Sequence, residues 1–377
     1  MKKMKAISIV FAVVLAVSLL AACGGGNNAP AAPAPAPSGG GAPAASAPTP
    51  AAPADDKVYS FMIDYPNPEN SAIYPLLVDW AEYVGQQSNG RIQAEIYPAG
   101  ALGALPDCVT NCLTGMTDGF WSGCSVYAGV FPVTDAFSLP MAGALSQEVM
   151  NASLRAMVAN NADMQKEWSN FHLIALHSGT PAPILFNRGI DISTPAAFKG
   201  AQMRISNKYT ADWMTNLGAT PVECGINSGY EYFEKNQIDS GLFFFDQLQS
   251  SALYEQIDAL LVPEDCIYSL TMFCLNQDRY NELPDDLKAV IDGSTDWFYD
   301  QLPAIYNKQM DNILDNKCPE YGVEIVYPDK AMMDALYAAS KNAASLWIEK
   351  MNGEGHDGQA LYDEATGYIA QFNKELN

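Results

Sequence analysis

Arg188 and Arg204 are the residues whose type and spacing most clearly indicate binding chemistry. They are two of only five arginines in the chain, and they lie sixteen positions apart in the segment LFNRGIDISTPAAFKGAQMRISNK. Each is expected on or beside a strand, because ILFNRG precedes one turn and AQMRIS follows another. A guanidinium group presents parallel N–H donors that match the two oxygens of a carboxylate. The pair therefore predicts a carboxylate-binding site.

A structural role is the alternative, in which each arginine pairs with an acidic neighbour such as Asp191. Arg204 favours ligand binding more strongly, because Met203 and Ile205 beside it are apolar. Its strand also leads to Asn207 at the expected start of a helix, and helix N-termini present free N–H groups to anions. Asn207 is interpreted either as an N-cap alone or as a cap that also contacts the ligand.

Aromatic residues at the expected strand ends are further candidates for the site. Phe243 begins a run of three phenylalanines, for which a strand buried on both faces, residues 242–245, is the simpler interpretation. The alternative interpretation is that one of the three rings projects into a ligand cleft. Trp121 at the end of a strand, and Tyr65 where the first strand meets its loop, carry the same two interpretations.

The charge balance restricts the partners of the protein. The chain has 20 basic and 43 acidic side chains, with a formal net charge of −23. Such a surface repels nucleic acids and anionic lipid headgroups. It also repels an anionic ligand at long range, so a carboxylate site needs a local positive focus. Arg188 and Arg204 are the predicted focus.

The first 56 residues are predicted to export and tether the protein. Three lysines and an apolar stretch too short to span a bilayer comfortably precede the lipobox Leu-Ala-Ala-Cys23. We therefore expect residues 1–23 to be a lipoprotein signal, with diacylation at Cys23 anchoring the protein outside the cytoplasm to the cell membrane. Residues 24–56 form a linker rich in Ala, Pro and Gly, without the large apolar side chains that could drive folding.

The cysteines and histidines do not indicate a metal site or a cofactor. Seven cysteines remain besides Cys23, so at least one thiol is unpaired within a monomer. Cys108 and Cys112 lie four apart on an expected helix, too far apart for a disulfide. There is no C-x-x-C pair, and the three histidines lack ligand spacing. Most of these cysteines are interpreted as small buried apolar residues.

The remaining 320 or so residues are predicted to form two α/β lobes. Strands and helices alternate at the start of this region, in the order typical of an open parallel sheet, which binds ligands at the carboxyl ends of its strands. Further along, we expect a crossing strand, a long helix interrupted by Pro303, and a final amphipathic helix. The expected elements named here are 58–64, 71–87, 91–97, 117–122, 147–167, 172–178, 269–275, 284–316 and 331–351.

Sequence signatures of enzymes are missing. The chain has no G-x-S-x-G, no P-loop, no G-x-G-x-x-G after a strand and no H-E-x-x-H. We therefore expect a binding protein and not an enzyme.

A family resemblance supports this expectation. GRIQAEIYPAGALG, LTGMTDG, FSLPM, ISTPAAFKGAQMRISNKYTADWMTNLGATPV, NQIDSG and NELPDDLKAVI occur in the order and at the spacing of motifs in one family. From about residue 57 to 377 the chain resembles the DctP-like solute-binding proteins of TRAP (tripartite ATP-independent periplasmic) transporters. The resemblance implies a periplasmic-binding-protein fold of type II. Its lobes, 57–185 with 270–312 and 186–269 with 313–377, are joined by crossing strands and braced by a long kinked helix.

The resemblance also implies roles for individual residues. Arg204 aligns with the family arginine that pairs with the ligand carboxylate, Arg188 with a second arginine near it, and Asn207 with a polar pocket residue. The family's lobes close on an organic acid and deliver it to integral membrane subunits. The protein is expected to be a monomer without a cofactor.

Three departures from the family pattern surround the aligned arginines. Phe243 stands near a position where family members often have a polar residue. The segment ECGINSGY differs from the sequence that the family usually has there, and the small acidic or amide residue that often occurs near Gly123 is replaced. They suggest an organic acid with an apolar or aromatic body. The alternatives to a TRAP receptor are the binding lipoprotein of an ABC-type uptake system, a secreted enzyme on the same scaffold, and a surface adhesin.

Overall fold

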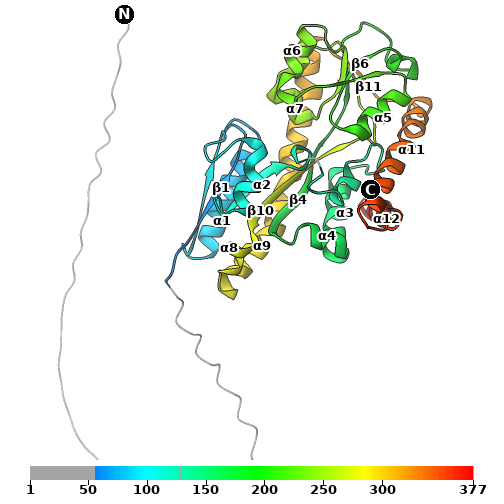
Figure 1. The fold of residues 1–377 in the computed structure, drawn as a ribbon. Helices are drawn as coiled ribbons and strands as arrows, with labels where there is room; N and C mark the ends of the chain where they lie inside the picture. Colours follow the sequence, from blue (N-terminus) through cyan, green and yellow to red (C-terminus); the bar gives the residue numbers. More distant parts are fainter. Residues whose placement is uncertain (1–55, 128, 377) are drawn as a thin grey trace, which may run out of the picture. The chain divides into compact units, whose positions relative to one another are not determined.

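The computed structural model describes residues 56–127 and 129–376. The predicted signal, Cys23 and nearly all of the linker lie outside the described residues. Within them the chain forms an α/β fold with two sheets, which confirms the predicted fold class (Figure 1). None of the helices in the described part is long and apolar enough to cross a membrane.

The first sheet has five strands in the order β2-β1-β3-β10-β4. β1 is parallel to both β2 and β3, as the alternating pattern predicts, whereas β10 is antiparallel to β3 and β4. Its strands are β1 (Tyr59–Asp64), β2 (Ile92–Tyr97), β3 (Gly119–Gly123), β4 (Phe171–Pro181) and β10 (Tyr268–Asn276).

The second sheet has six strands in the order β11-β9-β5-β8-β6-β7. β6 lies between β7 and β8 and is parallel to both, so the carboxyl ends of these three strands share one edge. Its strands are β5 (Ile184–Phe186), β6 (Gln202–Ile205), β7 (Thr220–Glu223), β8 (Ser240–Leu242), β9 (Ala259–Leu261) and β11 (Glu324–Val326).

Helices cover both sheets. Those up to the middle of the chain are α1 (Tyr74–Gln87), α2 (Cys108–Leu113), α3 (Gln147–Asn160), α4 (Ala162–Glu167), α5 (Lys208–Asn216), α6 (Gly229–Glu234) and α7 (Phe245–Ser250). Those after it are α8 (Gln277–Asn281), α9 (Asp285–Asp311), α10 (Cys318–Tyr321), α11 (Lys330–Gly353) and α12 (Gly358–Leu376). A π-helical segment, Asn312–Lys317, follows α9 directly.

Three expectations need correction. The helix expected over 147–167 is two helices, because Asn161 ends α3 and caps α4 through its side chain. The strand expected over 242–245 ends at Leu242, and Phe245 already begins α7. The sequence reading also missed α12, whose buried face packs with Trp347 and Val149 in the core beside the first sheet. That packing differs from the lobe boundary we expected, which placed 313–377 with the second lobe.

The long strands β4 and β10 connect the two sheets. β4 leads through Pro181 into β5 of the second sheet, and β10 returns to the first sheet after β9. Gly179 lies on β4 at a register shift in its antiparallel pairing with β10. A Cβ atom there would be 2.3 Å from Ser269 Oγ and 3.5 Å from the ring of Tyr306, so a larger residue would force Ser269 to move.

The long helix α9 braces the first sheet from one side. The indole of Trp80 on α1 donates a 2.8 Å hydrogen bond to Ser294 on α9. The same ring packs edge-on against Phe273 of β10, with centroids 4.6 Å apart. A buried aromatic with a satisfied N–H thus joins a helix, the sheet and the brace. Pro303 lies inside α9 without interrupting it, so the break expected there is not observed, and the helix continues beyond it to contact α7.

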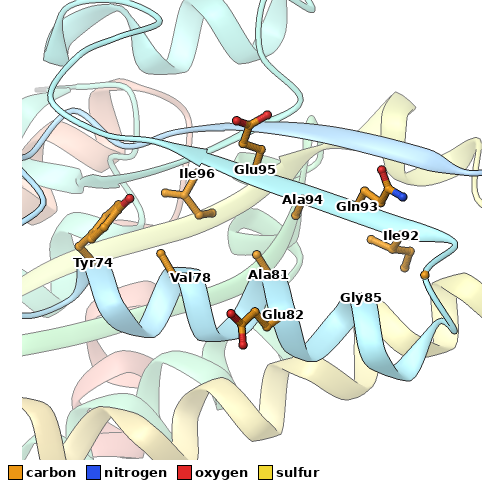
Figure 2. Close-up of a pocket in the computed structure, with 11 residues that line it drawn as sticks. Tyr74, Val78, Ala81, Glu82, Gly85, Ile92, Gln93, Ala94, Glu95 and Ile96 are labelled. Carbon is orange, nitrogen blue, oxygen red and sulfur yellow. The ribbon is translucent and has the colours of Figure 1, made fainter. Parts of the chain in front are cut away.

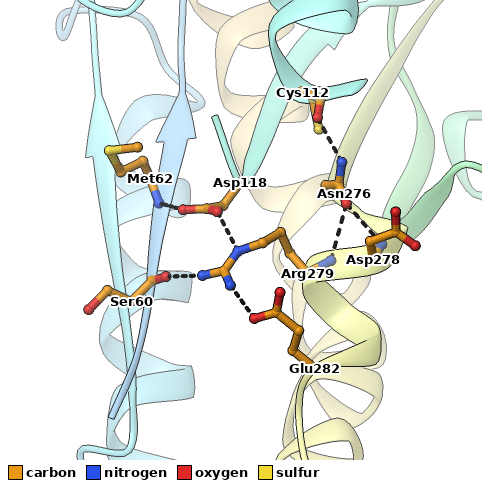
Figure 3. Close-up of polar contacts among 8 residues, drawn as sticks. All are labelled: Ser60, Met62, Cys112, Asp118, Asn276, Asp278, Arg279 and Glu282. Atoms are coloured by element: carbon orange, nitrogen blue, oxygen red, sulfur yellow. Dashed lines mark hydrogen bonds and ion pairs between the residues drawn. The ribbon is translucent and has the colours of Figure 1, made fainter. Parts of the chain in front are cut away.

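A polar network centred on Arg279 joins α8 to β1 and to the residue that precedes β3 (Figure 3). Arg279 Nε donates to Asp118 at 2.6 Å and its Nη2 donates to the carbonyl oxygen of Ser60 at 3.1 Å. The other oxygen of Asp118 accepts from the backbone N–H of Met62 at 2.8 Å. Glu282 completes the network by pairing with Arg279 Nη1. The network links β1, the approach to β3 and α8.

We predict that Arg279→Met lowers the free energy of unfolding by about 1–3 kcal/mol, because it leaves Asp118 without its cation. Arg279 is only partly buried, which favours the lower half of that range. Urea unfolding followed by circular dichroism measures the loss. Lys330→Met is the matched control, since its pair with Asp334 is exposed and should contribute less than about 1 kcal/mol. Equal losses in the two variants would contradict the assigned role.

Candidate ligand-binding site

Arg204 stands near the carboxyl end of the central strand of a parallel group. In the sheet it is level with Val222 of β7 and Gly241 of β8. Its Nε donates to the carbonyl oxygen of Cys224 at 3.4 Å, and its Nη1 donates to that of Leu242 at 2.6 Å. Both acceptors lie at or just beyond the strand ends, where open α/β sheets bind ligands.

The guanidinium group of Arg204 is a buried cation. The residue is only 4 % exposed, and burial lowers its pKa from the ordinary value. An arginine nevertheless stays protonated at any physiological pH. Among residues 56–127 and 129–376, none of the carboxylates forms an ion pair with it, and its Nη2 has no acceptor. A buried charge is strongly disfavoured unless it is paired, so the site is electrostatically suited to an anion.

Phe243 supports this cation from one side. The Arg204 guanidinium carbon lies 4.7 Å from the centroid of the Phe243 ring, a cation–π arrangement. The ring is fully buried and belongs to the core formed with Phe233 and Phe245. The position predicted to line a cleft therefore holds a packing residue that orients the arginine.

Two glycines make room for the Phe243 ring. A Cβ atom at Gly229 would be 2.6 Å from the ring, and one at Gly241 would be 2.8 Å from it. Gly241 is also level with Arg204 in the sheet, where a Cβ atom would be 3.0 Å from the Cβ of the arginine. The ECGINSGY segment thus has a physical role at Gly229, because its glycine allows the aromatic ring to lie beneath the cation.

Asn207 is the N-cap of α5. Its Oδ1 accepts from the backbone N–H groups of Tyr209 and Thr210, both at 3.0 Å, in a capping box with the Thr210 hydroxyl. The cap uses the amide oxygen, while the Nδ2 group has no acceptor in the part of the chain that the structure describes. Of the two interpretations offered by the sequence, capping is observed, and the free amide donors lie three residues beyond Arg204.

Arg188 occupies a different place in the second sheet. Its Nη1 donates to the carbonyl oxygen of Ala197 at 2.7 Å, and its Nε pairs with Asp239 at 3.5 Å. Asp239 directly precedes β8 and also accepts from the N–H of Gln202, the first residue of β6. Arg188 is therefore at the amino ends of the strands whose carboxyl ends hold Arg204. The structure does not bring the two arginines together, and the acidic partner is Asp239, not Asp191.

Tyr65 and Trp121 lie together at the carboxyl ends of β1 and β3. Their ring centroids are 5.4 Å apart, and Tyr74 stands 5.6 Å from Tyr65 on its other side. The Tyr65 hydroxyl is hydrogen-bonded to Ser71, and burial raises its pKa to about 12. The buried indole N–H of Trp121 has no partner among the described residues. An unpaired buried donor of this kind is available to a ligand.

Asp246 is a residue of this region that the sequence reading missed. It stands in the first turn of α7, and its Oδ1 accepts a 3.0 Å hydrogen bond from the hydroxyl of Thr180 on β4. This hydrogen bond joins α7 to the first sheet. Burial is the main cause that raises the pKa of Tyr65, and the charge of Asp246 adds to it. Burial raises the pKa of Asp246 itself. The sequence feature that could have identified Asp246 is an acidic residue directly after three phenylalanines.

A separate pocket of about 460 Å³ lies between α1 and the edge strand β2 (Figure 2). Tyr74, Val78 and Ile96 contribute to its largely apolar lining, and its charged lining residues are Glu82 and Glu95. These carboxylates would repel an organic anion. The pocket contains none of the predicted ligand-binding residues, so we place the candidate site at Arg204.

The described residues contain no group of three or more His, Cys, Asp or Glu side chains placed to hold a metal ion. His177 is fully buried between the crossing strands, and burial lowers its pKa to about 4. Its ring nitrogens lie 3.0 Å and 3.1 Å from the hydroxyl of Thr271, which connects β4 and β10. This histidine is a neutral structural residue.

Two sheets joined by crossing strands, with a buried cation at a strand edge, define an α/β solute-binding protein. The sequence profile of the bacterial extracellular solute-binding proteins of family 7 (DctP) matches residues 64–350. The chain belongs to this family. Among curated proteins, the 2,3-diketo-L-gulonate-binding periplasmic protein YiaO of Escherichia coli K12 is 21% identical over 256 residues, which are 67% of this chain and 76% of YiaO.

Solved structures share the fold. A TRAP solute-binding protein from a marine metagenome, described as specific for aromatic acids, superposes with a TM-score of 0.74 at 24% identity over 83% of this chain and 99% of that one. Its complexes contain metahydroxyphenylacetate or 3-hydroxybenzoate. A TRAP solute-binding protein from Rhodoferax ferrireducens T118, with copurified benzoate, has a TM-score of 0.74 at 22% identity over 85% and 100% of the chains.

We predict that Gly229→Ala destabilises the fold by about 1–3 kcal/mol, because the new methyl group overlaps the buried Phe243 ring. Gly225→Ala is the matched control. Both glycines have ordinary negative φ values, −55° and −62°, but the nearest atom to a Cβ at Gly225 is Ser228 Oγ at 3.8 Å. Chemical unfolding of the two variants measures the difference. A Gly229→Ala protein as stable as the Gly225→Ala protein would exclude tight packing beneath Arg204.

Proposed function

We propose that the protein is an extracytoplasmic receptor for an organic acid, which it binds by its carboxylate at Arg204 and delivers to the membrane subunits of a TRAP transporter. The observation that carries this proposal is the buried Arg204 guanidinium without an anionic partner in the described chain. A carboxylate supplies that anion and accepts from the free Nη2 donors. Membership of the solute-binding family supports the transport role.

The body of the ligand is proposed to be apolar or aromatic. Tyr65 and Trp121 offer ring faces and an unpaired indole N–H at the carboxyl ends of the first sheet. Such surfaces suit an aromatic ring better than a polyhydroxylated sugar acid, whose many hydroxyl groups each need a polar partner. The aromatic acids bound by the marine and Rhodoferax proteins support the same ligand class.

The ligand contacts are proposed to come from Arg204, Asn207, Tyr65 and Trp121. Phe243 is proposed to act indirectly, because its buried ring holds the guanidinium in place. Arg188 is proposed to brace the opposite ends of the strands through Asp239 and the carbonyl group of Ala197.

Membrane attachment is proposed to occur through lipid on Cys23. The lipobox at the end of a short apolar stretch supports this assignment, and two acyl chains are sufficient for stable anchoring. The Ala- and Pro-rich segment that follows is proposed to act as a spacer between the anchor and a monomeric receptor.

We predict that Arg204→Gln weakens the binding of benzoate about tenfold to a few hundredfold, because a charge-assisted hydrogen bond contributes about 1.5–3 kcal/mol. The affinity of Arg204→Lys for benzoate should lie between those of the wild-type protein and Arg204→Gln, since lysine keeps the charge but lacks the parallel N–H donors of the guanidinium group. Isothermal titration calorimetry measures the affinities. A prior thermal-shift screen of monocarboxylates, dicarboxylates, neutral sugars and peptides selects the probe, because ligand at 100 Kd stabilises by about 2.7 kcal/mol.

Arg188→Gln is the control for this experiment. It removes the same charge from the same sheet, and we expect lower thermal stability with affinity unchanged within about threefold, because its contacts are structural. A protein that responds only to neutral sugars or peptides would refute the carboxylate proposal.

We predict that Cys23→Ser prevents acylation and releases the protein from the membrane fraction, whereas Cys224→Ser leaves it there. Metabolic labelling with palmitate and cell fractionation measure both outcomes. Retention of an unlabelled Cys23→Ser protein in the membrane would overturn the lipid-anchor proposal.

A further inference from the structure

We propose that Asp246 is the second polar anchor of the ligand site and accepts a hydrogen bond from a donor group remote from the ligand carboxylate. The ligand class is then a monocarboxylic aromatic acid that bears a hydroxyl or N–H group. This inference rests on the proposed function, because it assumes that Arg204 holds the carboxylate.

The position of Asp246 in the chain brings it close to Arg204. The guanidinium donates to the carbonyl oxygen of Leu242, and Asp246 follows only four residues later in the first turn of α7. Four residues span at most about 14 Å even when fully extended. The backbone that carries Asp246 is therefore within about 14 Å of the backbone group that accepts from Arg204.

Thr180 fixes the orientation of the carboxylate. Its hydroxyl donates to Asp246 Oδ1 at 3.0 Å, and it accepts from the Asp246 backbone N–H at 3.3 Å. Thr180 itself is held, because it is buried in the last residues of β4. A carboxylate at the start of a helix, held by a hydroxyl group of a buried strand, is positioned to select among ligands.

The carboxylate of Asp246 keeps room for a ligand donor. Its donors are the Thr180 hydroxyl and the backbone N–H groups of Asp246 and Gln247 at the start of α7, and no cation in the described part of the chain pairs with it. A carboxylate can accept about four hydrogen bonds, whereas this one has a single side-chain donor. The aromatic side chains of Tyr65 and Tyr306 are its electrostatic neighbours across from α7.

The two anchors have opposite preferences, and this difference determines ligand orientation. Arg204 attracts a carboxylate, whereas Asp246 repels one and favours a donor. A dicarboxylate places its second anion against Asp246 and is disfavoured. A hydroxylated aromatic monocarboxylate satisfies both ends in one orientation only.

The test compares benzoate, its 3-hydroxy and 4-hydroxy derivatives, 3-hydroxyphenylacetate, 3-methoxybenzoate and benzene-1,3-dicarboxylate on the full-length protein by calorimetry. We expect at least one hydroxylated acid to bind about tenfold to a hundredfold more tightly than benzoate, because its hydroxyl donates to a charged acceptor. The methoxy compound, which has no donor, should lose that gain. The dicarboxylate should bind more weakly than benzoate.

The variant Asp246→Asn should reduce the hydroxyl gain to less than about threefold while changing benzoate affinity by less than about threefold. Glu234→Gln is the matched control, because it removes one negative charge from an exposed position of the same lobe and should keep the gain. Thr180→Val should reduce the affinity advantage of the hydroxylated acid over benzoate, because the Asp246 carboxylate loses its hydrogen-bond donor. Thr180→Ser keeps that donor and should retain the advantage.

The outcomes separate the two proposals. Benzoate binding that depends on Arg204, with no hydroxyl gain or a gain kept in Asp246→Asn, overturns the role of Asp246 and leaves the receptor proposal intact. Failure of every carboxylate to bind the wild-type protein overturns both. If Asp246→Asn does not fold, the wild-type comparison of the 3-hydroxy and 3-methoxy acids still decides, since equal affinities would refute the donor requirement.

Discussion

A buried cation that has no anionic partner among residues 56–127 and 129–376 is the feature on which the candidate site depends. Arg204 is 4 % exposed, and its two protein acceptors are neutral carbonyl groups at the ends of neighbouring strands. Carbonyl dipoles and the face of Phe243 lower the electrostatic penalty of burial but do not neutralise the charge. The fold therefore maintains a positive site inside a strongly acidic protein, and the surrounding glycines permit the close packing that keeps the guanidinium in place.

The sheet topology explains how this charge can be held. β6 lies between two parallel neighbours, so the carbonyl groups that end β7 and β8 converge on the side chain of Arg204. At the opposite ends of the same strands, Arg188 and Asp239 join the segment after β5 to the entrance of β8. Two arginines that look alike in sequence thus serve one sheet differently. Arg188 is paired and structural, whereas Arg204 lacks an anionic partner in the described part of the chain and is suited to bind an anion.

Much of the fold could be read from the sequence, but only part of the site. Apolar periodicity located α1, β1, β2 and the crossing strands, because their buried faces repeat at the helix or strand period. The run Phe243 to Phe245 misled, since consecutive apolar rings suit a strand and a strand-to-helix junction equally well, and Phe244 is in fact only partly buried. Spacing alone could not show that Arg188 and Arg204 lie at opposite strand ends. That separation follows from the antiparallel pairing of β5 with β8, which is a tertiary choice.

Thr180 belongs both to the connection between the sheets and to the site. It follows Gly179 on the strand where Ser269 and Tyr306 approach the backbone, and its hydroxyl holds Asp246 on α7. The carboxylate is therefore supported by the element that links the two sheets, while the cation is supported by the second sheet and the Phe243 ring. A ligand that contacts both groups would span these two supports. Its binding energy would then depend on the relative placement of the sheets, which provides a physical route from ligand recognition to a change in lobe arrangement.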